Sequence, residues 1–246
     1  NLDDPREIVM PNSRVRALIP LFAAVAVWSC GGGDSDDSQA AAPPAPAPAP
    51  APSPPPPAPA PTPPAPPPIP PLAQPPIDIS GTAAPVGIDY WGDNSNAAGG
   101  KGETIDGIPC RQMDETFHIH THLSIVLNGE LLTIPDQLGM VPATSTVPGC
   151  FYQIHNHDKA GRLHIESPVP VSYTLGSFFK IWGQTLSSTN IAGITGLPVV
   201  VYVTDNGSTV RHEGDPSTIE LTSKRQITIQ IGSQLQAIPN FSWNGS

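Results

Sequence analysis

The chain has 246 residues and a net charge of −10, with only 11 basic residues, which argues against nucleic acid as a partner. Its 34 prolines lie mostly before residue 77, so the overall composition misdescribes the folded part. Residues 77–246 are long enough for one domain with a sizeable core. Their net charge of about −7 suits a cation as ligand, although ordinary solubility explains it equally well.

The first 29 residues have the pattern of a signal peptide preceded by a short upstream extension. We expect Met10 to be the natural start, with Arg14 and Arg16 as the charged region of the signal peptide. Residues 17–27 are an apolar run that is too short to span a bilayer. The run leads into Val-Trp-Ser-Cys, which resembles the lipobox of bacterial lipoproteins, with Cys30 as the lipidated residue. An ordinary secretory peptide with an incidental cysteine is the alternative.

Two linking segments follow. Residues 30–39 form an acidic tether of Gly, Ser and Asp, and residues 40–76 are almost wholly Pro and Ala. Such a sequence adopts polyproline II and could reach about 110 Å as a semi-rigid spacer. The lipoprotein resemblance, with Gly31 after the cysteine, implies an exported protein anchored by lipid. The outer membrane is its expected location, with the domain facing the periplasm or the cell surface.

The folded part begins with irregular sequence and then shows its strongest feature at residues 117–127. His118, His120 and His122 alternate with apolar residues there, so a strand would place all three on one face. Asn128-Gly129 predicts a type I′ hairpin turn before a return strand at 130–134. A face with three imidazoles is a binding surface rather than a packing solution.

A second histidine-bearing hairpin is predicted at residues 150–157 and 162–166. His155 and His157 share one face of the first strand, and His164 and Glu166 share one face of its partner. Asp158 most often serves as a turn-former in such a position, and Gly161 supplies the positive φ of the turn.

A single helix is predicted at residues 174–186, with Thr174 as its N-cap and a broad apolar stripe. Alternation predicts further strands at 198–204, 209–212 and 225–231. The expected fold is therefore mainly β, an antiparallel sandwich or barrel-like domain closed by one capping helix. No Gly-rich phosphate loop occurs, so nucleotide binding is not indicated.

Two cysteines remain for the folded domain once Cys30 is assigned to lipid. In an exported domain, Cys110 and Cys150 should form a disulfide. Closing a loop of about 40 residues would contribute roughly 4 kcal/mol on the chain-entropy model. The pairing would also bring the two histidine-bearing regions together. A cysteine ligand for copper is the alternative.

Six of the seven histidines lie in these two regions, and at this density they indicate a metal site. Residues i and i+2 of a strand are about 6.6 Å apart, so two imidazoles can converge on one ion, but His118 and His122 cannot easily share one. A single site would take two of the first three histidines and complete its shell from the second region. All six together would suggest two metals, or one metal with the other histidines supporting its ligands. Imidazole-rich sites suit Zn or Cu. His212, in a polar context, is expected to be an ordinary surface residue. The predicted ligands are His118, His120, His122, His155, His157 and His164.

The second block also resembles a known group of proteins. HNHDKAGRLHIESP followed by YTLGSFFKIWG is similar to a largely uncharacterised family of exported bacterial and archaeal proteins. Its members carry an H-x-H-x-H strand and an H-T-H-D-x-x-G-x-x-H-x-E-S-P block, in which Asn156 here replaces Thr. The likeness covers residues 117–183 and implies that the histidines belong together, without indicating an activity.

The leading hypothesis is a lipoprotein that binds Cu or Zn outside the cytoplasm for storage, sensing or transfer. A metal-dependent enzyme of hydrolase, lyase or oxygenase type is the alternative, with Glu166 or Asp158 as the base. A structural or adhesion module whose histidines only form hydrogen bonds is the third. The sequence identifies no protein partner, and no membrane contact beyond the lipid anchor.

Overall fold

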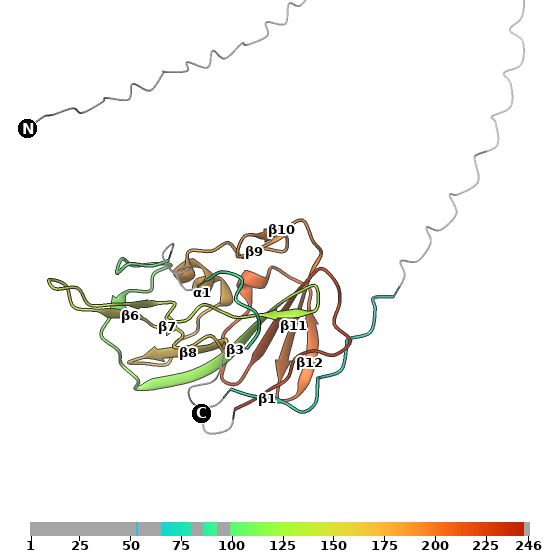
Figure 1. The fold of residues 1–246 in the computed structure, drawn as a ribbon, viewed down its shortest axis with the longest axis horizontal. Helices are drawn as coiled ribbons and strands as arrows, with labels where there is room; N and C mark the ends of the chain where they lie inside the picture. The colour runs from blue at the N-terminus through green and yellow to red at the C-terminus, as the bar shows by residue number, and fades with distance from the viewer. Residues whose placement is uncertain (1–52, 54–64, 80–85, 93–98, 244–246) are drawn as a thin grey trace, which may run out of the picture. The chain divides into compact units, whose positions relative to one another are not determined.

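The computed structural model describes Ser53 and residues 65–79, 86–92 and 99–243 (Figure 1). The predicted signal peptide, Cys30, the tether and most of the Pro-rich linker lie outside these residues. The described chain is mainly β with one α-helix, as predicted. None of its helices is long and apolar enough to cross a membrane.

The largest sheet has seven strands in the order β12-β11-β13-β3-β8-β7, with β4 added on β3. Its central strand β3 pairs antiparallel with β8 along its first half and parallel with β13 along its second half. The parallel pair was not anticipated, because alternation shows that a strand exists but not which strand it joins. The bounds are β3 (Phe117–Leu127), β4 (Glu130–Leu132), β7 (Ile154–His155), β8 (Arg162–Ser167), β11 (Val199–Asp205), β12 (Ser208–His212) and β13 (Gln226–Ile231).

The β3–β4 hairpin forms as the sequence predicted. Asn128 and Gly129 have φ values of 50° and 91°, the positive angles that a type I′ turn requires. The return strand ends at Leu132, two residues before the predicted end.

The main core lies on the apolar face of β3. Leu123 and Ile125 pack in one cluster with Phe178 and Trp182 of helix α1 (Leu175–Trp182). Thr174 is the N-cap, as predicted, because its hydroxyl accepts from the Ser177 amide. The helix is shorter than predicted, since Gly183 takes a left-handed conformation and ends it. Because successive strand residues face opposite sides, the histidines of β3 point away from this core.

The described part of the domain has three smaller sheets, two of them pairs: β1 (Ile77–Asp78) with β14 (Phe241–Ser242), and β9 (Asn190–Ile191) with β10 (Ile194–Thr195). The third has the order β2-β6-β5, from β2 (Cys110–Arg111), β6 (Cys150–Tyr152) and β5 (Met140–Val141). A short 3-10 helix spans Pro216–Thr218.

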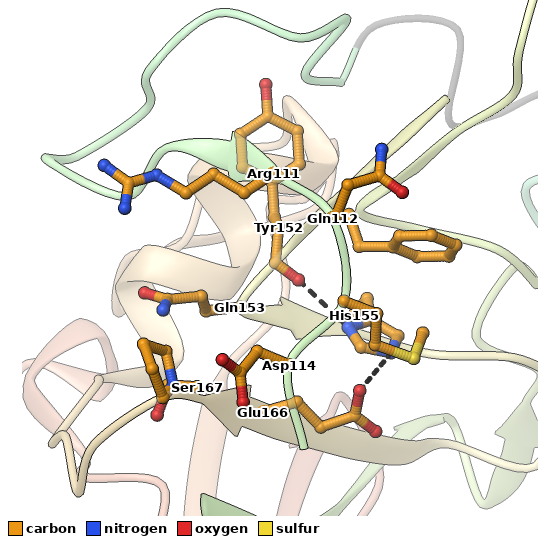
Figure 2. A pocket seen from close by; sticks show the side chains of 11 residues that line it. Arg111, Gln112, Asp114, Tyr152, Gln153, His155, Glu166 and Ser167 are labelled. Atoms are coloured by element: carbon orange, nitrogen blue, oxygen red, sulfur yellow. Dashed lines mark hydrogen bonds and ion pairs between the residues drawn. The ribbon is translucent and has the colours of Figure 1, made fainter. Parts of the chain in front are cut away.

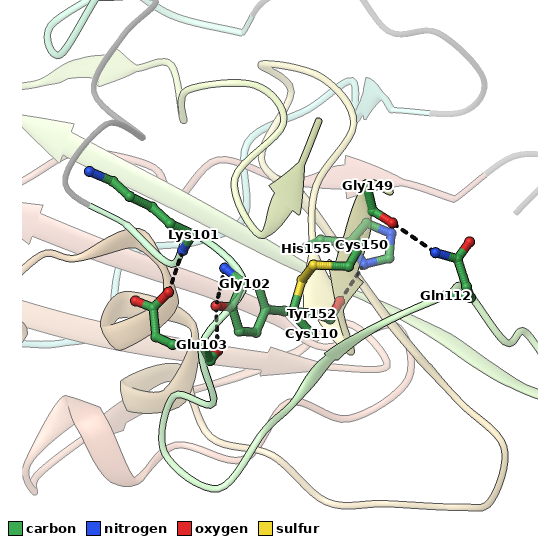
Figure 3. Close-up of a disulfide and its surroundings, with 9 residues drawn as sticks. All are labelled: Lys101, Gly102, Glu103, Cys110, Gln112, Gly149, Cys150, Tyr152 and His155. Atoms are coloured by element: carbon green, nitrogen blue, oxygen red, sulfur yellow. Dashed lines mark hydrogen bonds between the residues drawn. A yellow bond between two sulfur atoms is a disulfide. The ribbon is translucent and has the colours of Figure 1, made fainter. Parts of the chain in front are cut away.

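The predicted disulfide between Cys110 and Cys150 is confirmed, and it ties β2 to β6 (Figure 3). The run predicted as one strand at 150–157 is interrupted at Gln153, so that β6 and β7 belong to different sheets.

The contacts of the domain begin before the predicted boundary at residue 77. Leu72 forms a parallel bridge with Ile238, and the Ala73 amide donates to the Ile238 carbonyl over 2.8 Å. The end of the Pro-rich segment therefore contacts the folded domain.

Candidate metal centre

Strand register gathers the predicted ligands on one face of the central sheet. His120 of β3 lies opposite His164 of β8, and His164 lies opposite His155 of β7. In the next row, two residues along, His118 lies opposite Glu166. Residues two apart on a strand point to the same face of the sheet, so the side chains of these two rows lie next to one another.

The ring nitrogens approach one another closely. His164 Nδ1 lies 3.2 Å from Nε2 of both His118 and His120, and 3.1 Å from Glu166 Oε1. His155 Nε2 lies 3.3 Å from His157 Nε2. These donor atoms form two groups, each with all atoms within 4.8 Å of one another. The first group is His155, His157, His164 and Glu166, and the second is His118, His120 and His164. Together these six residues are called the histidine cluster.

The cluster lies at the boundary between core and solvent. His155, His164 and Glu166 are buried, whereas His118 and His157 are exposed. Burial lowers the pKa of His120 and of His155 to about 4 and that of His164 to about 3. Neighbouring histidines and Arg162 lower the pKa of His164 further. These three imidazoles are therefore neutral at pH 7, the state in which a ring nitrogen can bind a metal.

A backbone carbonyl sets the orientation of His155. The Nδ1 atom of His155 lies 2.9 Å from the Tyr152 carbonyl oxygen, which can only accept, so Nδ1 carries the proton. Nε2 is then left with its lone pair toward His157, as metal-binding histidines require. The Tyr152 hydroxyl in turn donates to the Glu103 carbonyl over 2.6 Å (Figure 3). Sequence reasoning could not find this role of Tyr152, because a main-chain atom performs it.

Asn156 fixes the backbone between His155 and His157. Its side-chain amide donates to the carbonyls of Pro135 and Asp158, and its oxygen accepts from the Leu138 amide. Asn156 is fully buried, so these bonds are shielded from water. Its place between two histidines was visible in the sequence, but its partners 18 and 21 residues away were not.

His122 does not join the cluster, which corrects the expectation that all six histidines do. Its Nε2 donates to the Ala160 carbonyl over 2.8 Å, and its ring stacks on Phe241 with centroids 3.7 Å apart. It is 1% exposed. Its partner across the sheet is Arg162, whereas that of His120 is His164, and it belongs to neither donor group. His122 is a packing residue.

The two predicted carboxylates have different surroundings. Asp158 accepts from the Ala160 amide over 2.9 Å and lies 3.4 Å from the Arg162 guanidinium, so it holds the turn. Gly161 in the same turn has φ of +83°, as predicted. Glu166 instead lies within the cluster. Within the described chain, Glu166 Oε2 and His164 Nε2 are buried without a hydrogen-bond partner.

A pocket of about 140 Å³ opens beside the cluster (Figure 2). His155 and Glu166 form one wall, and the polar side chains around them come from several segments. The sequence could not indicate this pocket, because its walls meet only after β2, β6 and β8 are assembled. The other polar residues that line it are Arg111, Gln112, Asp114, Tyr152, Gln153 and Ser167.

Comparison with known proteins found no match: no family model, no curated protein and no solved structure matches the chain. The chemistry of the cluster therefore carries the functional argument.

Proposed function

We propose that this protein is an extracytoplasmic lipoprotein that binds a transition metal, Zn or Cu, through the histidine cluster, for storage, sensing or transfer. The observation that carries the proposal is the spacing of the ring nitrogens. Two nitrogens on one tetrahedral zinc, each about 2.1 Å from the ion, are about 3.4 Å apart. The separations here are 3.2 and 3.3 Å.

Hydrogen bonding alone does not account for the arrangement. A neutral imidazole has one N–H donor and one acceptor nitrogen. His164 Nδ1 faces Glu166 and two other histidines, and one proton can serve only one of these contacts well. A cation between the rings would satisfy the remaining lone pairs, together with the buried Glu166 Oε2.

The kinds of donor atom in the cluster limit which metals it can bind. Imidazole nitrogens with one carboxylate suit Zn and Cu(II), and site geometry and metal supply then decide between them. The chain has only 3 methionines, and none is in the cluster, which argues against a thioether carrier of Cu(I).

The proposal includes export from the cytoplasm, and the disulfide and the N-terminal sequence support it. A disulfide between Cys110 and Cys150 is stable in an oxidising compartment such as the periplasm. The apolar run before Cys30 and the Pro/Ala spacer after it fit an anchored domain held away from an outer membrane. The resemblance to exported proteins with the same histidine block points the same way.

The pocket favours a second candidate function, a metal-dependent enzyme. Glu166 lines both the pocket and the cluster, so it could act as base toward a water or substrate held there. Asp158 is less suited, because its carboxylate is engaged by Ala160 and Arg162. The four donors of the first group instead favour a binder, since they would complete a tetrahedral shell.

Elemental analysis tests metal binding directly. The full chain would be purified from the membranes of an expressing bacterium without chelators, beside His120→Ala/His157→Ala and the control His212→Ala. His212 lies outside both donor groups, on β12. We expect near-stoichiometric metal in the wild type and the control, and loss in the double variant. A wild type that stays empty after challenge with Zn and Cu would leave only the structural or adhesion role.

A further inference from the structure

The cluster offers more donors than one ion can use. Five imidazoles and one carboxylate meet on one face, whereas a tetrahedral zinc takes four ligands. Donors on opposite sides of one ion are at most about 4.2 Å apart at ordinary Zn–N distances. The donor atoms here fall into two groups rather than one.

His164 is the one member that the two groups have in common. Its Nδ1 faces Nε2 of His118 and of His120 at 3.2 Å and Glu166 Oε1 at 3.1 Å. Its Nε2 is buried and has no hydrogen-bond partner in the described chain. The His157 ring stands edge-on to the His164 ring, with centroids 4.5 Å apart, and the His155 ring is stacked beside the His164 ring. Members of both groups therefore flank the His164 ring.

We propose that the cluster is a two-metal centre, in which His164 bridges the ions. One ion is held by His118 and His120, and the other by His155, His157 and Glu166. His164 binds one ion through each ring nitrogen and loses its remaining ring proton to solvent when both sites are filled. This inference rests on the proposed metal-binding function and adds to it the number of ions and their shared ligand.

The two sites differ in character. The first has three imidazoles and includes His118, whose side chain is 32% exposed, so its remaining coordination position is open to solvent. The second has three imidazoles and a buried carboxylate, which complete four positions. Glu166 Oε1 also lies 3.1 Å from His118 Nε2, so the carboxylate stands between the two sites and its negative charge favours a divalent cation in each.

Metal counting with paired variants tests the proposal. The metal-free full chain would be saturated with Zn(II), freed of excess metal and analysed for bound zinc. We expect two equivalents in the wild type and in the control His212→Ala. We expect one equivalent in His118→Ala/His120→Ala and one in His155→Ala/His157→Ala. Circular dichroism would verify that each variant is folded.

Loading the protein with Cu(II) tests whether His164 bridges the two ions. Two Cu(II) ions joined through one imidazole ring are magnetically coupled, so the electron paramagnetic resonance intensity should fall well below that of the copper counted chemically. Each double variant, with one ion left, should show full intensity.

The outcomes separate the two proposals. One equivalent of zinc in the wild type would overturn the two-metal centre and leave the metal-binding function intact, whereas none would remove both. Two equivalents with loss of both ions in either double variant would overturn the division into sites. Full copper signal at two equivalents would overturn the bridging role of His164.

Discussion

Glu166 is the residue at which the binding and catalytic hypotheses differ most clearly. Its carboxylate is buried beside His155 and His164 and also lines the pocket. A metal ligand and a catalytic base would both have to lie where Glu166 lies, beside the histidines and the pocket. Their roles can be separated, because a ligand contributes to metal affinity and a base acts only on the reaction.

Replacing Glu166 with Gln keeps the shape of the side chain and removes its charge. If Glu166 is a ligand, zinc affinity should fall by at least about tenfold, since even residues that only orient ligands account for about 10–100-fold. Competition with a chromophoric chelator measures this, with the exposed Glu213→Gln as control. Unchanged affinity would show that Glu166 is not a ligand and would favour the enzyme.

A glycine beside Leu123 and His122 provides a test of the local packing. Gly161 has φ of +83°, and a Cβ there would lie 2.3 Å from the Leu123 carbonyl oxygen. Gly207 has φ of +79° with nothing within 4 Å, so it is a matched control. Gly161→Ala should lower the free energy of unfolding by roughly 2 kcal/mol or more, and Gly207→Ala by only about 1–2 kcal/mol. Equal losses in chemical denaturation would contradict the close approach.

At the level of elements, the sequence predicted the features that depend on neighbouring residues, such as strand alternation, turns and helix caps. The β3–β4 hairpin, the histidine face of β3 and the Thr174 cap follow from neighbouring residues, and the structure has all three. The break at Gln153 and the parallel β3–β13 pair depend on contacts between distant segments, so the sequence did not reveal them. Likewise, the spacing of the histidines could not show that His122 lies outside the cluster, because its contacts, Ala160 and Phe241, are distant in sequence.

The disulfide lies at the start of strand β6, the strand whose last residue orients His155. Cys150 begins β6, and Tyr152 at the end of β6 orients His155 through its carbonyl. Cys110→Ser/Cys150→Ser should therefore lower the free energy of unfolding by about 4 kcal/mol, for a closed loop of 40 residues. It should also weaken zinc binding. Urea denaturation and chelator competition measure the two effects, and reduction of the wild type should reproduce both. Stability lost with zinc affinity unchanged would show that β6 does not position His155.

For the whole molecule, the buried histidines predict stability that depends on pH. Burial lowers the pKa of His122, His120 and His155 to about 4, whereas unfolded histidine has a pKa of about 6.5. Between these values the unfolded chain binds more protons than the folded one, so stability falls as pH drops from about 6.5 to 4. It is fully present above this window.

His122 allows that prediction to be tested outside the cluster. The lowered pKa of His122 corresponds to roughly 3 kcal/mol lost across the window. His122→Gln should therefore make the metal-free chain less sensitive to pH by about this amount. Urea denaturation of wild type and variant at pH 7, 5.5 and 4 measures the difference. Parallel pH profiles would contradict the assignment of His122 as a neutral, buried packing residue.

The central claim is that the histidine cluster is a metal site, and His164, common to both donor groups, is the residue on which it depends most. The most direct measurement is zinc titration of the metal-free full chain against a chromophoric chelator, for wild type, His164→Ala and His212→Ala. We predict tight binding by wild type and His212→Ala, and at least about 100-fold weaker binding by His164→Ala, more than loss of an orienting residue causes. No binding by the wild type, or equal affinity in His164→Ala, would contradict the claim.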